Sequence, residues 1–154
     1  MNRLLPLLSA LLLLAPSACG PDRGDPAHVT FAPALGVDLA AMRRSDSGLY
    51  TQDLVEGTGA EARVGRYLEV HYTGWLPDGT RFDTSRDTPQ PLEILRLGVQ
   101  PRLIAGWEEG LVGMKVGGTR RLVIPSWLGY GEAGTVGIPP DSVLVFEVEL
   151  LLAR

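Results

Sequence analysis

The sequence contains a single cysteine, Cys19, so no disulfide bond can form within the chain in any redox compartment. It has only two histidines: His28 has no second ligand at metal-binding spacing, and His71 has no candidate nucleophile beside it. A pair of catalytic carboxylates, a Cys/His cluster and a phosphate-binding loop are also missing from the sequence. We therefore expect no metal and no cofactor, and a function that needs neither a nucleophile nor a proton shuttle.

Basic residues are scarce as well. The chain has 14 lysines and arginines against 18 acidic residues, for a net charge of -4, and Arg43-Arg44 and Arg120-Arg121 are isolated pairs. The absence of a basic stripe argues against nucleic acid as a partner. A length of 154 residues with 45% hydrophobic content indicates one domain with one core.

The longest apolar run, from Leu4 to Ala15, is too short to span a bilayer. Arg3 precedes it and the small residues Ser17-Ala18 follow it, a pattern typical of a cleaved signal peptide over residues 1–18. Cys19 comes directly after these small residues. This placement resembles the lipobox of bacterial lipoproteins, in which the new N-terminal cysteine carries the lipid.

The lipobox resemblance predicts that Cys19 is lipidated and anchors an exported, periplasmic protein to a membrane. One departure is Pro16, which stands where that pattern usually has leucine. Gly20 is not the acidic residue associated with inner-membrane retention, so we expect the outer membrane. The alternative is ordinary secretion of a soluble protein with a free terminal thiol.

Residues 19–47 are expected to precede the folded domain, which we place at residues 48–154. The stretch from Gly20 to Pro33 is rich in proline, glycine and charge, and this composition predicts a flexible tether. A short helix is expected between Leu35 and Met42. The exposed character of the tether also makes His28 a solvated residue.

Alternating apolar and polar residues predict a largely antiparallel sheet in the domain. Leu68, Val70 and Tyr72, for example, share one face of a strand, whereas His71 lies on the other, more polar face. Turn signals such as Pro77-Asp78-Gly79-Thr80 separate the extended segments. These segments are Leu49–Val55, Tyr67–Leu76, Arg81–Ser85, Leu92–Leu97, Thr119–Ile124 and Val143–Leu152.

One segment, Leu103–Gly113, has helical spacing instead. Ile104, Trp107 and Leu111 recur on one face. A helix of two to three turns is not stable alone in water, so it must pack against the sheet. The fold class expected is therefore α+β, with a strongly curved antiparallel sheet around one short helix.

A long segment without periodicity, Ser126–Pro140, separates the last two predicted strands. Loops of this length inside a compact domain are usually functional. Its glycines give it conformational freedom, and Tyr130, Val136 and Ile138 supply side chains that can contact a ligand.

Several motifs together resemble the FKBP-type peptidyl-prolyl cis-trans isomerase family, in matching order and spacing from about Gly48 to Leu152. They are Val70-His71-Tyr72-Thr73-Gly74, Gly79-Thr80-Arg81-Phe82-Asp83-Thr84-Ser85, Gly106-Trp107-Glu108-Glu109-Gly110-Leu111, Gly129-Tyr130-Gly131 and Ile138-Pro139-Pro140. The resemblance implies a half-barrel of antiparallel strands around one helix, and isomerase activity on Xaa-Pro bonds.

The resemblance also implies a ligand pocket with Trp107 as its floor. Its walls would be Tyr72, Phe82, Asp83, Leu103, Ile104, Tyr130 and Phe146. In the family, the main-chain N–H matching Ile104 and the hydroxyl matching Tyr130 each hold a ligand carbonyl, and the residue matching Ile138 closes over the proline ring.

The sequence departs from the family pattern at some pocket positions. Leu92 and Ile94 stand about where the family often has two aromatic residues that contact the substrate. Thr88 replaces an arginine that braces the pocket aspartate in some members, which leaves Asp83 without an expected partner. The segment Thr135–Pro139 is one residue short of a common form. We expect these changes to affect macrolide affinity and peptide preference more than the activity.

The leading hypothesis is thus a monomeric, membrane-tethered isomerase that acts on proline-containing, unfolded or refolding exported chains. Macrolides of the kind that this family binds are expected inhibitors. The competing hypothesis is a proline-binding chaperone or assembly module that keeps the fold with little catalysis. The departures at Leu92, Ile94 and Thr88 favour this second hypothesis, because a looser pocket can bind proline without distorting the bond.

Overall fold

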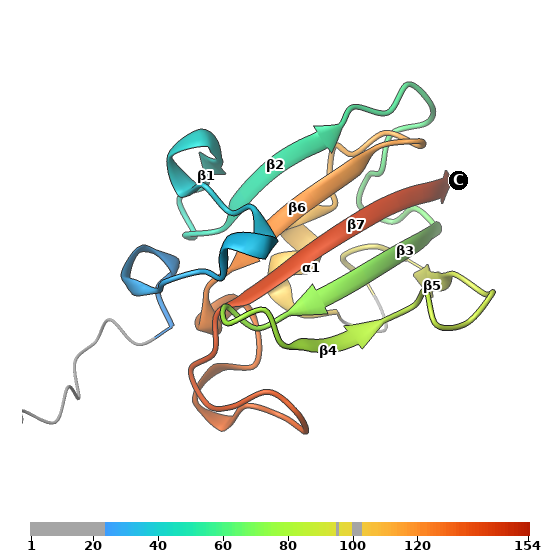
Figure 1. Cartoon of the computed structure of the whole chain (residues 1–154). Helices are drawn as coiled ribbons and strands as arrows, with labels where there is room; N and C mark the ends of the chain where they lie inside the picture. Colours follow the sequence, from blue (N-terminus) through green and yellow to red (C-terminus); the bar gives the residue numbers. More distant parts are fainter. Residues whose placement is uncertain (1–23, 95, 100–102) are drawn as a thin grey trace, which may run out of the picture.

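The computed structural model describes residues 24–94, 96–99 and 103–154 (Figure 1). Within these ranges it has one short α-helix, α1 (Ala105–Gly110), and seven strands. The strands are β1 (Arg43–Arg44), β2 (Tyr50–Val55), β3 (Leu68–Trp75), β4 (Arg81–Thr84), β5 (Leu92–Ile94), β6 (Thr119–Ile124) and β7 (Leu144–Ala153). The same ranges contain five short 3₁₀ helices: η1 (Pro26–His28), η2 (Pro33–Leu35), η3 (Leu39–Ala41), η4 (Ser126–Leu128) and η5 (Gly131–Ala133).

All strands join one antiparallel sheet in the order β1-β2-β6-β7-β3-β4, and β5 pairs with β3. One edge of β3 is shared between two short partners: β5 pairs with Leu68–Val70, and β4 pairs with Thr73–Trp75. The sheet is curved, and α1 lies on its concave side, behind β6 and β7 in Figure 1. The predicted α+β fold with a curved antiparallel sheet around one helix is confirmed.

The alternation of residues identified the long strands to within about one residue, because much of each strand places alternate apolar side chains in the core. Leu68 and Val70 of β3 are fully buried, as are Val148 and Leu150 of β7. The prediction for Leu92–Leu97 is wrong at residues 96 and 97, which do not belong to a strand. The chain turns at this point, and Gly98 has a φ of 71°. The turn is held by a hydrogen bond from the Leu97 N–H to the Arg66 carbonyl.

The helix is shorter than its apolar pattern, which extended over Leu103–Gly113. Ile104 precedes it, and its carbonyl accepts the N–H groups of Trp107 and Glu108. The sheet lies very close: a Cβ added at Gly106 would stand 2.5 Å from Ile124 Cγ2, and one at Gly110 only 2.7 Å from Leu122 Cδ2. The two glycines thus let β6 approach the helix backbone and hold Trp107 in the core.

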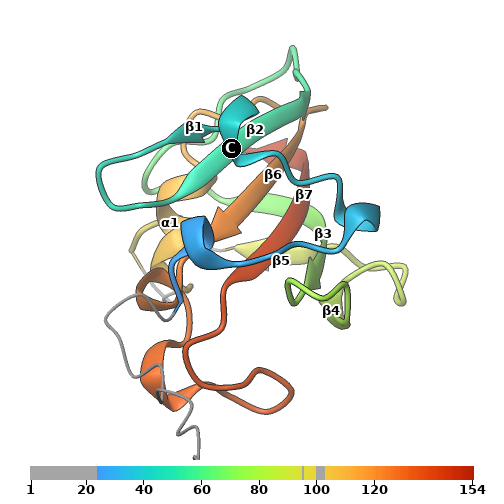
Figure 2. The ribbon, with the colours of Figure 1, turned by 60° about the vertical axis from the view of Figure 1, so that its left-hand side comes forward.

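The expected flexible tether is not found from Gly24 onward. Residues 24–47, called here the N-terminal extension, run across the face of the sheet opposite α1 (Figures 1 and 2). Leu35 and Met42 are buried there against Tyr50, Val123 and Val145. The physical reason is that this outer face of the sheet is itself apolar and has to be covered.

The helix expected between Leu35 and Met42 is also wrong. The structure has two separate 3₁₀ turns, η2 and η3, in its place. Gly36, in the left-handed region with a φ of 57°, ends the first, and the Asp38 carboxylate accepts the Ala40 N–H at the start of the second. The short strand β1, which pairs with β2, was not predicted.

The segment Ser126–Pro140 is more ordered than its composition suggested. It contains the 3₁₀ helices η4 and η5, closed by hydrogen bonds from Gly129 N–H to Ser126 O and from Gly134 N–H to Gly131 O. The predicted signal peptide and Cys19 lie outside the described residues. Among the described helices, none has the length and apolar character needed to cross a membrane.

Candidate functional site

Three aromatic rings from different elements meet at the mouth of the half-barrel. Trp107 comes from α1, Phe146 from β7 and Tyr72 from β3. The Trp107 ring centroid lies 5.0 Å from that of Tyr72 and 5.3 Å from that of Phe146, with both ring pairs at 86°. This edge-to-face geometry is the favoured arrangement of aromatic pairs, so the rings fix one another's orientation.

A fourth ring, Phe82 of β4, supports this group from the side. It packs edge-to-face on Phe146, with the centroids 5.4 Å apart. Gly74 makes room for both rings, because a Cβ added there would lie 2.6 Å from Phe146 Cε1 and 2.7 Å from Phe82 Cζ. The absence of a side chain at Gly74 thus allows Phe146 to occupy its position.

The rings border a cavity of about 270 Å³. This volume is just below the range of roughly 300–1,000 Å³ that small-molecule sites usually have. The cavity is lined by Tyr72, Asp83, Leu92, Leu103, Ile104, Trp107, Tyr130 and Phe146. Apart from Asp83, the two phenol hydroxyls and the Trp107 indole N–H, which is buried without a hydrogen-bond partner among the described residues, these side chains are apolar. The site can therefore hold a small apolar ring and exclude water from it.

Asp83 has a partner in the structure, contrary to the expectation drawn from Thr88. The Tyr72 hydroxyl donates a hydrogen bond to Asp83 Oδ2 at 2.7 Å. Burial, followed by this bond to the carboxylate, raises the pKa of the Tyr72 phenol well above its ordinary value of 10. The phenol is therefore neutral at physiological pH, and it holds the carboxylate at the cavity wall.

Two further polar groups face the space that a ligand would occupy. Tyr130 lies between η4 and η5 at the rim, is 39% exposed, and its hydroxyl makes no hydrogen bond with the described residues. Ile104 stands at the start of α1, and no main-chain carbonyl in the described ranges accepts its N–H. Within the described part of the chain neither donor is engaged, and their binding to ligand carbonyls stays a prediction from the family resemblance.

Three residues named from the sequence do not line the cavity. Phe82 packs edge-to-face on Phe146 and is not part of the cavity wall. Ile94 is buried in the core, where it pairs with Leu68 across β5 and β3. Ile138 is buried beside a neighbouring hollow formed with Leu76 and Pro139. Of the two positions where aromatic residues are common in the family, only Leu92 contributes to the wall.

Ser85 is a supporting residue that the sequence did not reveal. It is almost fully buried, and its Oγ accepts the Tyr72 N–H at 2.9 Å and contacts His71 Nδ1 at 3.0 Å. His71 thus has the structural role expected of it. The signal available in the sequence was only that Ser85 ends the predicted return strand, where it can reach the strand that carries both residues.

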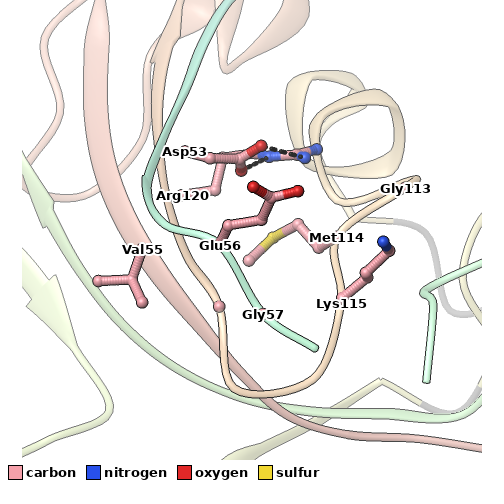
Figure 3. A pocket seen from close by; sticks show the side chains of 9 residues that line it. Asp53, Val55, Glu56, Gly57, Gly113, Met114, Lys115 and Arg120 are labelled. Atoms are coloured by element: carbon pink, nitrogen blue, oxygen red, sulfur yellow. Dashed lines mark hydrogen bonds and ion pairs between the residues drawn. The ribbon is translucent and has the colours of Figure 1, made fainter. Parts of the chain in front are cut away.

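A second hollow near the end of β2 offers a contrast (Figure 3). Its volume is about 40 Å³, and Asp53, Glu56, Lys115 and Arg120 stand around it. Arg120 donates two hydrogen bonds to the Asp53 carboxylate, at 2.6 and 3.1 Å. This hollow is small and charged, so it cannot accommodate a proline ring, and the aromatic cavity remains the candidate site.

Comparisons with known proteins agree with this geometry. The sequence profile of the family described as FKBP-type peptidyl-prolyl cis-trans isomerase matches residues 59–151. The FK506-binding protein of Neisseria meningitidis serogroup B is 57% identical over 105 residues, which are 68% of this chain and 94% of that protein. The isomerase FkpA of Escherichia coli K12 is 44% identical over 110 residues, 71% of this chain and 39% of that protein.

Solved structures give the same result. The crystal structure of FkpA from Escherichia coli superposes with a TM-score of 0.68 at 43% identity, over 74% of this chain and 52% of the other. The structure of AtFKBP13 superposes with a TM-score of 0.67 at 38% identity, over 73% of this chain and 98% of the other. The chain therefore belongs to the family of FKBP-type peptidyl-prolyl cis-trans isomerases, enzymes that act on proline-containing polypeptides.

Proposed function

We propose that the aromatic cavity is the catalytic site and that the protein accelerates Xaa-Pro isomerisation in exported, unfolded or refolding chains. The observation that carries the proposal is the group of three rings around a cavity of about 270 Å³: Tyr72 and Phe146 each pack edge-to-face on Trp107 and are tilted at 56° to each other. A prolyl ring is small and apolar, and these rings offer it an apolar surface on several sides.

The reaction needs no bond to be made or broken, because only the C–N bond of the amide rotates. The barrier is about 18–20 kcal/mol, and uncatalysed rotation takes roughly tens to hundreds of seconds. A turnover of about 100 per second requires the barrier to fall by roughly 5–6 kcal/mol. The site thus has to bind the twisted amide more tightly than the planar amide by only this moderate free energy.

Desolvation contributes to this difference. The planar amide is stabilised in water by the charge separation of its resonance form, which the twisted amide has lost. An apolar cavity therefore disfavours the planar ground state relative to the twisted transition state. Trp107 and Phe146 belong to this apolar lining, and both side chains are held in the core, at 4% exposure each.

Hydrogen bonds supply the remainder and orient the substrate. Three donors of the cavity lining have no partner among the described residues: the Ile104 N–H, the Tyr130 hydroxyl and the Trp107 Nε1–H. The first two are proposed to hold substrate carbonyls. Each ordinary hydrogen bond contributes about 0.5–1.5 kcal/mol. Tyr72 and Asp83 hold each other at the wall, so that neither group competes for the substrate.

The direct experiment follows isomerisation of a short Xaa-Pro peptide by NMR exchange, with the purified protein and with a Phe146→Ala variant. We expect acceleration by the wild type and a loss of at least tenfold in the variant, because the cavity would lose its central wall. Acceleration that is unchanged in Phe146→Ala would place catalysis elsewhere on the molecule.

A second candidate function is a proline-binding chaperone with little catalysis. Leu92 favours it, because this aliphatic side chain lines the cavity at a position where the family often has an aromatic ring. Suppression of aggregation of a refolding protein without any rate enhancement on the peptide would support this alternative and exclude the first.

We also propose that the cavity binds FK506-type macrolides. The support is the 57% identity with a relative named FK506-binding protein and the apolar wall described above. Inhibition of peptide isomerisation by FK506 is the expected result. Full activity at saturating FK506 would indicate that the cavity is too different around Leu92 to accept the drug.

Export and anchoring form a separate part of the proposal. The apolar run Leu4–Ala15 and the Ser17-Ala18-Cys19 junction support a signal peptide followed by a lipidated cysteine, and Gly20 after the cysteine favours attachment of the periplasmic protein to the outer membrane. Metabolic labelling with radioactive palmitate tests this. Label that appears in the wild type and disappears in Cys19→Ser is expected, whereas an unlabelled, freely soluble wild type would favour ordinary secretion.

A further inference from the structure

Both ends of the N-terminal extension meet the start of the segment that carries Tyr130. At one end, the Gly24 carbonyl accepts the Ser126 N–H at 2.9 Å. At the other, the Ser47 carbonyl accepts the Trp127 Nε1–H, also at 2.9 Å and across 80 residues of sequence. Two consecutive residues of η4 are therefore held by the two ends of one segment.

At two positions next to η4 the backbone comes too close to leave room for a side chain. Gly24 has a φ of 84°, and a Cβ there would lie 2.0 Å from Ser126 Oγ. Gly48 has a φ of 94°, and a Cβ there would lie 3.0 Å from Trp127 Cζ2. The backbone thus contacts η4 closely both at Gly24, where the extension begins, and at Gly48, directly after it ends, and only glycine combines these dihedral angles with this spacing.

Ser47 also joins η4 to the helix. Its Oγ lies 3.0 and 2.7 Å from the two carboxylate oxygens of Glu109, which belongs to α1. The same helix carries Trp107, the floor of the cavity. A single residue of the extension is therefore bonded both to η4, which directly precedes the segment of Tyr130, and to the helix that carries Trp107.

We propose that the N-terminal extension, through Ser47 and Trp127, is a positioning element for Tyr130. The path is short, because only Leu128 and Gly129 separate Trp127 from Tyr130. It is also stiff: the Leu128 and Gly129 N–H groups bond to Pro125 and Ser126, and Leu128 packs on the core. A shift at Trp127 is thus transmitted through one 3₁₀ turn to the rim of the cavity.

This inference rests on the proposed role of Tyr130 in the site. It explains why Trp127, which is 49% exposed, nevertheless donates its indole N–H to a carbonyl 80 residues away. It also assigns the extension a role in the site in addition to covering the outer face of the sheet.

The test is a double-mutant cycle on the full chain with Trp127→Phe, which removes the indole donor, and Tyr130→Phe, which removes the hydroxyl. A bond of ordinary strength predicts that Trp127→Phe lowers kcat/KM by about threefold to tenfold. If Trp127 acts through Tyr130, the double variant should be no slower than Tyr130→Phe alone. Effects that multiply, or an unchanged rate in Trp127→Phe, would overturn the proposal.

Trp75→Phe is the matched control, because it also replaces an indole in contact with the extension but lies on the outer face of the sheet. It should retain the wild-type rate, and a loss equal to that of Trp127→Phe would overturn the specific role of Trp127.

A second measurement does not depend on activity. In protein with labelled tyrosine rings, Trp127→Phe should shift the Tyr130 resonance, assigned from Tyr130→Phe. If the Tyr130 resonance is unshifted in Trp127→Phe, the positioning role is overturned, whether or not the protein is active. If the resonance shifts but the wild type does not accelerate isomerisation, only the proposed function is overturned.

Discussion

Replacing Gly74 by alanine adds one methyl group at the point where two rings of the site meet. The new Cβ would lie 2.6 Å from Phe146 Cε1 and 2.7 Å from Phe82 Cζ. Carbon atoms pack at about 3.5–4.0 Å, so at least one ring has to move by roughly 1 Å. Overpacking of this kind destabilises a protein by about 1–3 kcal/mol.

The activity of the molecules that remain folded should fall as well. A displacement of about 1 Å in a site can reduce the rate by roughly a hundredfold, so we expect Gly74→Ala to lose about tenfold to a hundredfold in kcat/KM. Peptide isomerisation by NMR exchange gives the rate, and urea unfolding gives the folded fraction by which the rate is corrected.

Gly65→Ala is a suitable control for the Gly74 experiment. Gly65 has a φ of 84°, and a Cβ added there would have nothing within 4 Å, so alanine introduces backbone strain without a clash. This variant should be less stable but keep its activity per folded molecule. If Gly74→Ala also kept full activity per folded molecule, the reasoning that Phe146 must occupy this position for catalysis would be refuted.

Three further predictions concern single side chains. Phe82→Ala should lower both the midpoint of thermal unfolding and kcat/KM, because Phe82 supports Phe146 by an edge-to-face contact; wild-type activity would contradict this support. Leu35→Ala should lower the free energy of unfolding by about 2–3 kcal/mol with little change in activity, as measured by urea unfolding; no loss would mean that the extension is not part of the fold. Because the pKa of Tyr72 is raised in the folded state, its contribution to stability is present below pH 10 and is lost at higher pH. Urea unfolding should therefore show a steeper loss of stability above pH 10 in the wild type than in Tyr72→Phe, and equal slopes would contradict the raised pKa.

Regular patterns in the sequence predicted the sheet and the helix well. The alternation of Leu68 and Val70 with polar residues identifies β3, since a strand with one buried face leaves that pattern. Trp107 and Leu111 identified the buried face of α1 in the same way. The extension had no such period: its 3₁₀ turns are three residues long, and its apolar residues, among them Leu35 and Met42, meet the sheet at irregular intervals.

The site was only partly predictable, because the sequence does not give distances between strands. The motifs named the residues of the wall, but Phe82 and Ile138 do not line it in the structure. The bond from Tyr72 to Asp83 depends on the pairing of β3 with β4, where Gly74 stands opposite Asp83. Similarly, Gly74 makes room for two rings that come from other strands, β4 and β7. No local sequence pattern shows such a contact.

The central claim is that an apolar aromatic cavity is sufficient to accelerate prolyl rotation. The most direct measurement is the rate of cis-trans exchange in a short Xaa-Pro peptide with increasing amounts of the purified protein, in the presence and absence of FK506. The account predicts an exchange rate that rises in proportion to the protein concentration and returns to the uncatalysed value with the drug. An exchange rate that stays at the uncatalysed value at every protein concentration would contradict it.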